Sequence, residues 1–215
     1  MDGQSIRMDD EMGADQMEMI YTGNEIKEMD RQETKGGTEI LSLVEKAGEA
    51  IAEQIEQMPQ GPICIFCGAG NNGADGLSAA LLLARTRKVS VLFFHEHAVN
   101  SMMRSLYEAV VQSGIESWEI EDVTQIPEEL TVEQGIVVDA LLGAGSNRPV
   151  QGLLAKAIEK INALKRKAMV ISIDIPTGVF PDTGTVKGPA VCADITYSLM
   201  GHKPGVLLYP GAKHA

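Results

Sequence analysis

Short apolar segments alternate with helical segments along most of the chain, and this alternation limits the folds that the chain can adopt. The predicted strands are Ile63–Cys67, Val89–Phe94, Gly135–Leu142, Ala168–Ile173 and Ala193–Ser198, with a weaker one at Trp118–Ile120. The predicted helices between them are Leu77–Ala84, Val99–Ser113 and Leu153–Leu164. Strands that are apolar at every position are typical of parallel sheets that helices cover on both faces. The sequence therefore predicts a doubly wound α/β fold with a mostly parallel sheet.

Two more helices are predicted before the first strand. Thr22 and Glu25 have the spacing of a capping box, which favours a helix that begins at Thr22. A second helix is predicted from about Thr38 to Met58, because apolar residues recur there every three or four positions. Residues 1–33 contain ten acidic and three basic residues, and no period is visible up to about Glu18. We predict a mobile acidic leader over residues 1–20 and one domain over residues 21–215.

The balance of charge and the cysteine content narrow the class of protein. Eighteen basic and thirty acidic residues give a formal net charge of −12, which argues against nucleic-acid binding. No apolar run approaches the roughly 20 residues that cross a bilayer, and the acidic start does not resemble a secretory signal. Three cysteines are too few for a disulfide framework. We expect a cytoplasmic protein that binds neither nucleic acid nor membranes.

The loop after the first predicted strand has the sequence GAGNNGADG, residues 68–76. Its glycines match the GxGxxG pattern, and Glu96 lies where a ribose-binding acid would follow the next strand, so an NAD(P) oxidoreductase is one interpretation. Asn71, Asn72 and Asp75 argue against it, because the backbone of a dinucleotide-binding loop must approach the pyrophosphate closely. We also expect Asp75 at the start of the following helix, where it would repel a phosphate.

Two other predicted strands end in an aspartate. Asp139 leads into a glycine-rich loop that contains Arg148, a side chain suited to bind phosphate. Asp174 leads into a Pro-Thr-Gly turn that presents the Thr177 hydroxyl. An aspartate at the end of a buried strand costs free energy unless it is paired, hydrogen-bonded or bound to a cation. Because ligands bind beyond the carboxyl ends of the strands in such folds, the three loops are predicted to form one site.

The motifs of these loops resemble those of the YjeF N-terminal domain family, the NAD(P)H-hydrate epimerases. The resemblance rests on GAGNNGADG, VVDALLGAG and ISIDIPTGV, with YTGNEIKEMDRQ and LVEKAGEAIA before them and VKGPAVCADITYSLMGHKPG after them. It covers about Tyr21 to Gly211, with the motifs in the family's order. The resemblance implies a Rossmann-like three-layer α/β/α fold with N-terminal helices. It also implies that the chain lacks the domain's last strand and that a dehydratase domain follows in many relatives.

The resemblance implies a reaction in the repair of nicotinamide cofactors. The reaction interconverts the R and S forms of hydrated NADH and NADPH (NADHX and NADPHX), so that a stereospecific, nucleoside-phosphate-driven dehydratase, fused or separate, can restore the cofactor. Inversion at C6 needs one group that protonates the leaving hydroxyl and deprotonates the entering water, and we predict that Asp174 is this catalytic group. A homodimer is common in the family, but the sequence itself does not indicate one.

The resemblance also assigns ligands by position. The residues implied to contact the substrate are Asn71, Asn72, Gly73, Ala74, Asp75, Gly143, Ala144, Gly145, Ser146, Asn147, Arg148, Pro149 and Asp174. Asn72, Asp139 and Thr177 are implied to bind K+, and their oxygen atoms suit such a hard cation. The family usually has glycine in place of Ala74, serine in place of Thr177, and threonine and leucine in place of Ala144 and Ser146. None of these departures removes a predicted ligand.

Other interpretations stay open. A non-enzymatic scaffold of this family would have lost the site residues, whereas an NAD(P) oxidoreductase would transfer hydride and be indifferent to potassium. Lys203 is a candidate for charge near the site, with a solvated loop lysine as the alternative. Cys64 and Cys67 are predicted to be buried on opposite faces of a strand rather than to form a redox pair. His95-Glu96-His97 could bind a metal, but without an evident third ligand we favour a strand end that meets solvent.

Overall fold

The computed structural model describes residues 19–35 and 40–215, and helices and strands alternate within them as the sequence pattern predicts. The helices are α1 (Gly23–Lys35), α2 (Ile40–Glu56), α3 (Asn71–Leu83), α4 (Ser101–Gln112), α5 (Gly152–Leu164) and α6 (Pro204–Leu207), with 3₁₀ helices η1 (Val123–Gln125) and η2 (Gly211–Lys213). The strands are β1 (Ile63–Cys67), β2 (Val89–Phe94), β3 (Glu116–Ile120), β4 (Ile136–Ala140), β5 (Met169–Ile173) and β6 (Ile195–Tyr197). Most of the predicted leader, residues 1–18, lies outside the described residues.

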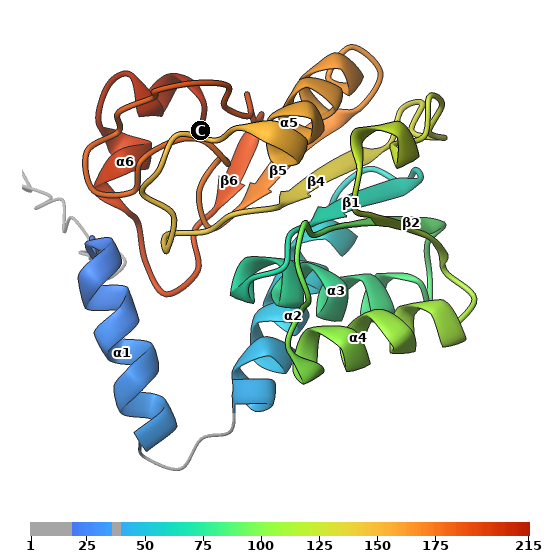
Figure 1. The fold of residues 1–215 in the computed structure, drawn as a ribbon, viewed down its shortest axis with the longest axis horizontal. Coiled ribbons are helices and arrows are strands. Elements are labelled where there is room, and N and C mark those ends of the chain that lie inside the picture. The colour runs from blue at the N-terminus through green and yellow to red at the C-terminus, as the bar shows by residue number, and fades with distance from the viewer. Residues whose placement is uncertain (1–18, 36–39) are drawn as a thin grey trace, which may run out of the picture.

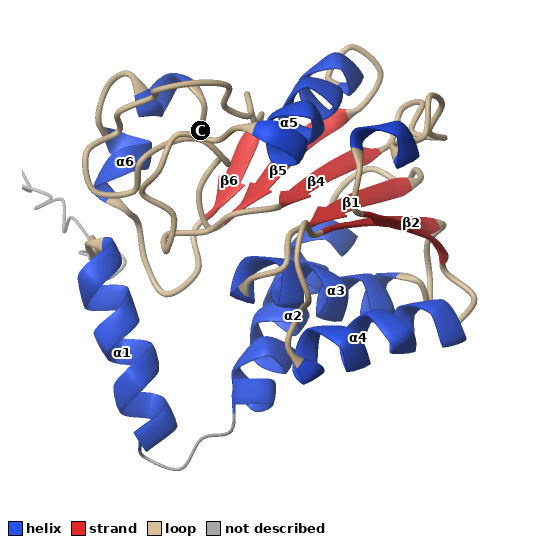
Figure 2. Cartoon of the chain, in the orientation of Figure 1, coloured by secondary structure: helices blue, strands red, loops and turns tan. Residues whose placement is uncertain are grey.

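Within the described residues, the strands form one sheet in the order β3-β2-β1-β4-β5-β6, and every neighbouring pair is parallel. Helices α2, α3 and α4 cover one face and α5 covers the other, so the fold has three layers (Figure 1, Figure 2). The chain runs from β1 outward to β3 and then crosses back to β4 on the other side of β1. Doubly wound sheets bind ligands in the crevice at such a change of direction. The predicted fold class is confirmed.

The side chains of the central strand β1 alternate between two apolar cores. Ile63, Ile65 and Cys67 belong to the core that includes α2, α3 and α4, whereas Cys64 and Phe66 belong to the core on the α5 side. All five are fully buried because helices cover both faces of the sheet. Burial raises the pKa of the Cys64 thiol to about 12 and raises the pKa of Cys67 as well. The two cysteines are therefore buried thiols on opposite faces, as predicted.

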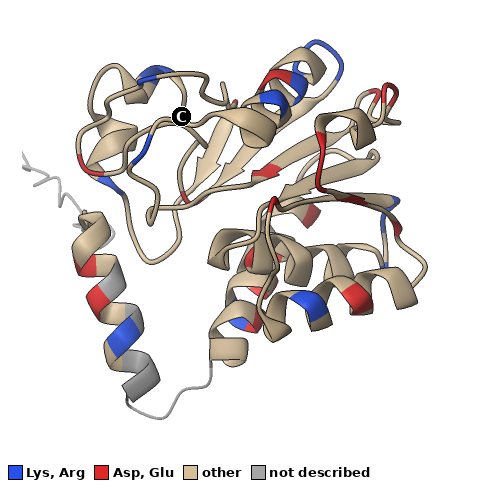
Figure 3. Ribbon diagram, viewed as in Figure 1, with Lys and Arg blue, Asp and Glu red and all other residues tan. Residues whose placement is uncertain are grey.

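The charged residues are distributed differently from the apolar residues of the two cores. Charged residues lie mainly on the helices and the connecting loops, and the central strands carry few of them (Figure 3). In the part of the chain that the structure describes, no helix is both long enough and apolar enough to cross a membrane.

The main difference from the predicted elements lies at the start of α3. The sequence pattern predicts a loop up to Gly76 and a helix from Leu77, but the helix begins at Asn71. Gly70 precedes the helix in an extended conformation, and its carbonyl accepts the Ala74 N–H over 3.0 Å. Asp75 is consequently the fifth residue of α3, and the prediction that it lies at the helix start is wrong.

Close packing explains why a glycine-rich segment is helical here. Glycine disfavours a helix on its own, but a side chain could not be accommodated at two of these positions. A Cβ atom at Gly73 would lie 1.7 Å from the Gly68 carbonyl oxygen, and one at Gly76 would lie 2.6 Å from the Ala140 Cβ. Contacts between the first turns of α3 and the ends of β1 and β4 thus outweigh the local preference.

Helix α1 stands apart from the three layers and is held at its N-terminal end (Figure 1). The predicted capping box is present: the Thr22 N–H donates to Glu25 Oε2 over 2.7 Å, and the Glu25 N–H donates to Thr22 Oγ1 over 3.3 Å. The Gly23 N–H donates to Asp182 Oδ1 over 2.6 Å. The start of α1 is thus tied to the long connection between β5 and β6.

Candidate functional site

A cavity of about 1070 Å³ lies at the change of strand direction, beyond the carboxyl ends of β1, β4 and β5. The first turns of α3, the loop after β4 and Asp174 after β5 line one side of it. Helices α1 and α2 and the pair Leu199-Met200 line the rest. A cavity of this volume suits a ligand at least as large as a typical drug molecule. The three loops that the sequence analysis selected therefore meet at one cavity.

Most residues that the family resemblance assigns to the substrate line this cavity. They are Asn71, Asn72, Asp75, Gly143, Ala144, Gly145, Ser146, Asn147, Arg148 and Asp174. Gly73, Ala74 and Pro149 are not part of its described lining. Gly73 packs against Gly68, Ala74 is fully buried in the apolar core, and Pro149 is exposed. The Ala74 methyl group, which stands where the family usually has glycine, thus packs in the core rather than in the cavity.

Asp139 is the penultimate residue of β4 and is completely buried. Its Oδ1 accepts from the Leu141 N–H (3.2 Å) and the Thr177 hydroxyl (2.7 Å), and its Oδ2 accepts from the Ser172 hydroxyl (2.8 Å) and the Thr177 N–H (2.8 Å). Burial raises the pKa of Asp139, and the hydrogen bonds from Thr177, Ser172 and Leu141 oppose that rise. Asp139 therefore ties the turn after β5 to the end of β4.

Asn72 brings an amide oxygen to the cavity from α3. Its Nδ2 donates to the Ile173 carbonyl over 3.2 Å, while its Oδ1 is buried and has no hydrogen-bond partner within the described part of the chain. Thr177 Oγ1 donates to Asp139 and accepts from the Leu142 N–H over 3.1 Å. Buried acceptors are normally satisfied by a donor or a cation. Of the three predicted cation ligands, Asp139 and Thr177 are in contact, and Asn72 offers an unsatisfied oxygen beside the end of β5.

Asp174 follows β5 and is only 9% exposed, although it lines the cavity. Its φ of 71° lies in the left-handed region, where residues other than glycine are uncommon. Its Oδ2 accepts from the Ala144 N–H over 2.6 Å. The absence of a side chain at Gly143 leaves room for this oxygen, because a Cβ atom there would lie 2.8 Å from it. The backbone at Asp174 therefore places a carboxylate at the cavity wall.

Lys203, in the loop after β6, is completely buried and is not part of the described cavity lining. Its ammonium forms an ion pair with Asp174 Oδ1 and donates to the carbonyls of Leu199 over 2.5 Å and Gly201 over 3.0 Å. The interpretation of Lys203 as a solvated loop lysine is therefore wrong, and the prediction of charge near the site is confirmed. The sequence does not show this burial, because the acceptors are loop carbonyls and a side chain 29 positions away.

The sequence analysis does not identify the outer wall of the cavity. Helix α1 contributes Ile26 and Arg31 to this wall, and α2 contributes residues that include Leu43 and Lys46. The apolar period of α2 indicates a face packed on the core, but it does not indicate which other residues face a ligand. Only the arrangement of α1 and α2 around the ends of β1 and β4 brings these side chains to the cavity.

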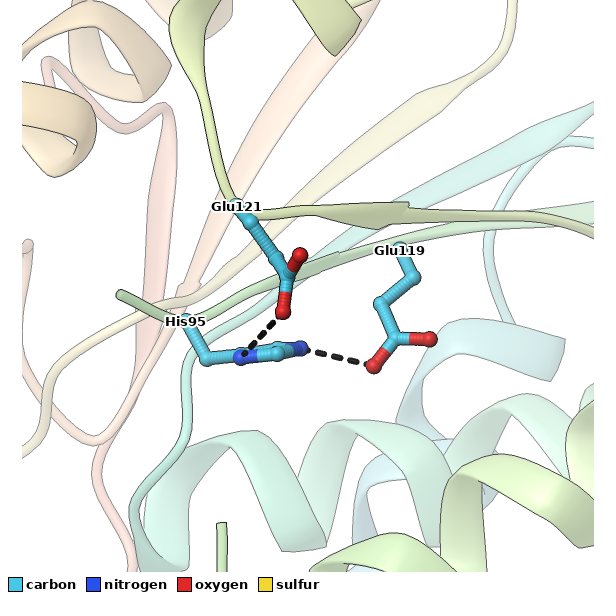
Figure 4. Close-up of side chains that lie close together, drawn as sticks. All are labelled: His95, Glu119 and Glu121. Atoms are coloured by element: carbon cyan, nitrogen blue, oxygen red, sulfur yellow. Dashed lines mark hydrogen bonds and ion pairs between the residues drawn. The ribbon is translucent and has the colours of Figure 1, made fainter. Parts of the chain in front are cut away.

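A second polar cluster lies away from the cavity, where β2 and β3 end (Figure 4). His95 is 5% exposed, whereas Glu96 and His97 are exposed, so the predicted strand end meets solvent from Glu96 onward but not at His95. Its Nε2 lies 2.7 Å from Glu119 Oε1, and its Nδ1 lies 3.7 Å from Glu121 Oε1. The two carboxylates thus face different ring nitrogens, and Arg104 pairs with the same Glu119 oxygen over 2.6 Å. This geometry fits an ion-pair network better than it fits a single metal centre.

Glu96 is the acid that an oxidoreductase interpretation assigns to the ribose. It lies near the start of α5, since a Cβ atom at Gly152 would be 3.3 Å from its Oε1. It is not part of the described lining of the cavity, whereas Asn71 and Asn72 of the GxGxxG segment are. The two parts of the oxidoreductase pattern therefore do not meet at this cavity.

Comparisons with known proteins identify relatives of the chain. A family model described as the YjeF-related protein N-terminus matches residues 40–205. The bifunctional NAD(P)H-hydrate repair enzyme Nnr of Thermofilum pendens is 39% identical over an alignment of length 198, and the match covers 88% of this chain and 37% of that relative. The NAD(P)H-hydrate epimerase of Limosilactobacillus fermentum is 32% identical over an alignment of length 182, and the match covers 83% of this chain and 84% of that relative.

The coverage of these relatives differs. The chain spans 37% of the length of the Thermofilum enzyme, whereas it matches most of the Limosilactobacillus epimerase. Among solved structures, the crystal structure of yeast ynu0, YNL200c, matches with a TM-score of 0.76 and covers 88% of this chain and 83% of that one. Because the sequence identity in that match is 21%, it shows a shared fold.

Proposed function

The chain belongs to the family of YjeF-related protein N-terminal domains, and from this membership we propose that it is an NAD(P)H-hydrate epimerase. Its substrate is NADH or NADPH that carries a hydroxyl group at C6 of the nicotinamide ring, and its reaction interconverts the R and S forms. The observation that supports this most is Asp174, a carboxylate held in a left-handed backbone conformation at the wall of a large cavity. A general acid and base must lie in such a position to reach the substrate.

The cavity suits the parts of a hydrated dinucleotide. The amide of Asn71 and the loop over residues 143–148 line it beside Asp174, where we place the hydrated ring. Arg148 after β4 and Lys46 on α2 line it as well, and their positive charge suits the phosphates of the substrate. The protein's net charge of −12 makes such local positive charge necessary for binding an anion.

Inversion at C6 can proceed without hydride transfer. The C6–O bond breaks as the lone pair of the ring nitrogen forms a C=N bond, and the hydroxyl takes a proton from Asp174 and leaves as water. Water then adds to the opposite face of the planar iminium, and Asp174 takes a proton from it. Asp174 regains in the second step the proton that it gives up in the first, so the cycle consumes no proton. The cation formed in the middle of the cycle faces the Asp174 carboxylate.

The residues at the ends of β4 and β5 fit a potassium ion. The buried Oδ1 of Asn72 lacks a partner within the described residues, and Asp139 and Thr177 contribute a carboxylate and a hydroxyl oxygen. Hard cations bind such oxygen donors. Asp139 already accepts four hydrogen bonds, so the Thr177 hydroxyl would turn its hydrogen away from Asp139 when both oxygens face the ion. Potassium would supply positive charge that stabilises Asp139 and joins the two strand ends.

The proposed activity has a chemical partner. An epimerase of this kind serves a dehydratase that accepts one epimer, and the bifunctional names of several relatives fit a dehydratase on the same or a separate chain. The homodimer stays an expectation from the family resemblance, and the cytoplasmic location stays a prediction from the sequence.

The test is the interconversion of separated R- and S-NADHX by the purified protein, followed by chromatography in potassium and in sodium buffer. We expect the protein to bring either epimer to the same final ratio well before the reaction without protein does, and to act faster with potassium. An epimer ratio that changes only at the rate without protein would refute the proposal and favour a non-enzymatic scaffold. Hydride transfer with intact cofactor and no response to potassium would instead favour an oxidoreductase.

A further inference from the structure

The buried ammonium of Lys203 is the feature that the proposed reaction leaves unexplained. Its three hydrogen-bonding partners are Asp174 Oδ1 and the carbonyls of Leu199 and Gly201. An ammonium group has three donors and no acceptor, so these partners use all of its hydrogens. A lysine that is 0% exposed and fully satisfied in this way is fixed in place and cannot exchange its partners for water.

The loop that holds Lys203 is shaped around the ammonium. Met200 has a φ of 60° and Gly201 a φ of 142°, so the backbone turns through the left-handed region twice in succession. This turn accompanies the approach of the carbonyls of Leu199 and Gly201 to Nζ, at 2.5 and 3.0 Å. A residue other than glycine in the left-handed region is held there only when its surroundings determine it. The lysine and the loop therefore support each other.

Asp174 is under a similar constraint. Its φ is 71°, its N–H donates to the Tyr197 carbonyl over 2.7 Å, and its Oδ2 accepts from the Ala144 N–H over 2.6 Å. These contacts fix the backbone and one carboxylate oxygen, and the buried Lys203, which is not among the residues that line the cavity, binds the other oxygen. Rotation of the carboxylate is thus opposed at both oxygens, and the removal of Lys203 would free one of them.

We propose that Lys203 is a positioning residue, which holds the carboxylate of Asp174 in the orientation that the reaction at C6 requires. This proposal rests on the proposed epimerase function. Lys203 acts through Asp174 and does not touch the substrate, because it is outside the described lining of the cavity. The same loop also holds the segment before α1: the Tyr21 N–H donates to the His202 carbonyl over 2.8 Å, and the His202 N–H donates to the Met19 carbonyl over 2.9 Å. Lys203 thus joins the reacting carboxylate to the base of the outer cavity wall.

The experiment is a double-mutant cycle with Lys203→Met, Asp174→Asn and the double variant. Methionine keeps the length of the side chain and removes the charge. The surface variant Lys156→Met is the matched control, because Lys156 is exposed and its ion-pair partner Glu159 is exposed as well. The parameters kcat and KM are measured for both hydrated cofactors, with excess protein for slow variants. Circular dichroism at the assay temperature confirms that each variant is folded.

We expect Lys203→Met to lower kcat about 10²-fold, the loss typical of a reacting group displaced by about 1 Å, and to leave KM almost unchanged. In the Asp174→Asn background, Lys203→Met should cause no further loss, because a residue that acts through Asp174 has nothing left to position. A further loss of the same size in that background would overturn the proposal. A rise in KM with unchanged kcat would also overturn it, since that result indicates a role in substrate binding.

Thermal unfolding of the same four proteins separates this proposal from the proposed function. If Lys203 holds Asp174, each single variant leaves one buried group without its partner and is therefore less stable than the wild type. The double variant should lose less stability than the sum of the two single losses. Additive losses would overturn the proposal even if the wild type is an active epimerase. If the wild type is inactive and the losses are not additive, the proposed function fails and the pairing of Lys203 with Asp174 stands.

Discussion

Asp139 and Asp174 end neighbouring parallel strands, and in the sequence they look alike, yet their surroundings differ. Asp139 is 0% exposed and accepts four hydrogen bonds from neutral donors. Asp174 has one neutral donor, the Ala144 N–H, and one charged partner, Lys203, and it lines the cavity. The first carboxylate holds two strand ends together, and the second lies at the wall of the cavity.

The difference shows how one local pattern can serve stability or chemistry. A carboxylate with every lone pair occupied by fixed donors cannot reach a substrate without breaking those bonds. A carboxylate that is supported from behind and from one side keeps a direction in which it can exchange a proton. The left-handed backbone at Asp174 turns it toward the cavity, whereas Asp139 continues β4 with its side chain among the strand ends.

The largest expected effect is on activity, in Asp174→Asn. The rate of epimer interconversion should fall about 10²–10⁴-fold, which is the usual contribution of a general acid and base. The protein should stay folded, because asparagine tolerates a positive φ. Initial rates and circular dichroism check both parts. If the variant keeps more than a small fraction of the wild-type rate, a group other than Asp174 is the general acid and base.

The next effect is on stability, in Asp139→Ala. The free energy of unfolding should fall by about 4 kcal/mol or more, because four buried donors lose their acceptor and each costs about 1–3 kcal/mol. Denaturant unfolding measures the loss. The control is Asp122→Ala, an exposed aspartate that accepts the Thr124 N–H, and its loss should be clearly smaller. Equal losses in the two variants would remove the distinction that we draw for Asp139.

The smallest effect is a pH dependence of the stability that Asp139 contributes. Burial raises its pKa above the ordinary value of 3.8, so the native state holds this proton more tightly than the unfolded state does. The stability that this proton contributes is complete at pH values below the pKa of Asp139 in the unfolded state, and it is lost as pH rises through the pKa of Asp139 in the folded state. In potassium-free buffer, the free energy of unfolding of the wild type minus that of Asp139→Ala should therefore fall as pH rises above 3.8. One proton limits the slope to about 1.4 kcal/mol per pH unit.

Potassium sharpens this last measurement. A cation beside Asp139 favours the charged carboxylate, so added potassium should reduce the loss of stability with rising pH, and sodium should reduce it less. If the free energy of unfolding of the wild type minus that of Asp139→Ala grows with pH in potassium-free buffer, the pKa of Asp139 is lowered on folding. That result would contradict the rise expected from burial.

Much of the fold could be predicted from the sequence. Apolar runs at 63–67, 89–94 and 169–173 are buried strands, and the helix that starts after Thr22 has the expected capping box. These features depend on residues close together in the chain, and their periods and spacings are visible there. The start of α3 was not predictable, because close packing of Gly73 against Gly68 and of Gly76 against the distant Ala140 side chain decides it.

The site divides in the same way. The sequence indicates which loops meet, since the carboxyl ends of parallel strands lie at one edge of the sheet. It does not indicate that His95 is buried between Glu119 and Glu121, or that α1 and α2 close the cavity. Those facts depend on which side chains a neighbouring element covers in the folded protein, and the periodicity of the sequence does not indicate this.

By itself, the sequence determined the alternation of strands and helices and the polar residues at three strand ends. These features depend on residues close together in the chain, because continuous apolar runs indicate burial on both faces and each loop has its own set of polar residues. Only the tertiary structure decided which aspartate is locked and which faces the cavity. That choice depends on the Thr177 and Ser172 donors around Asp139 and on the buried Lys203 behind Asp174. These partners lie 29 to 38 positions away in the chain, and only folding brings them within hydrogen-bond distance.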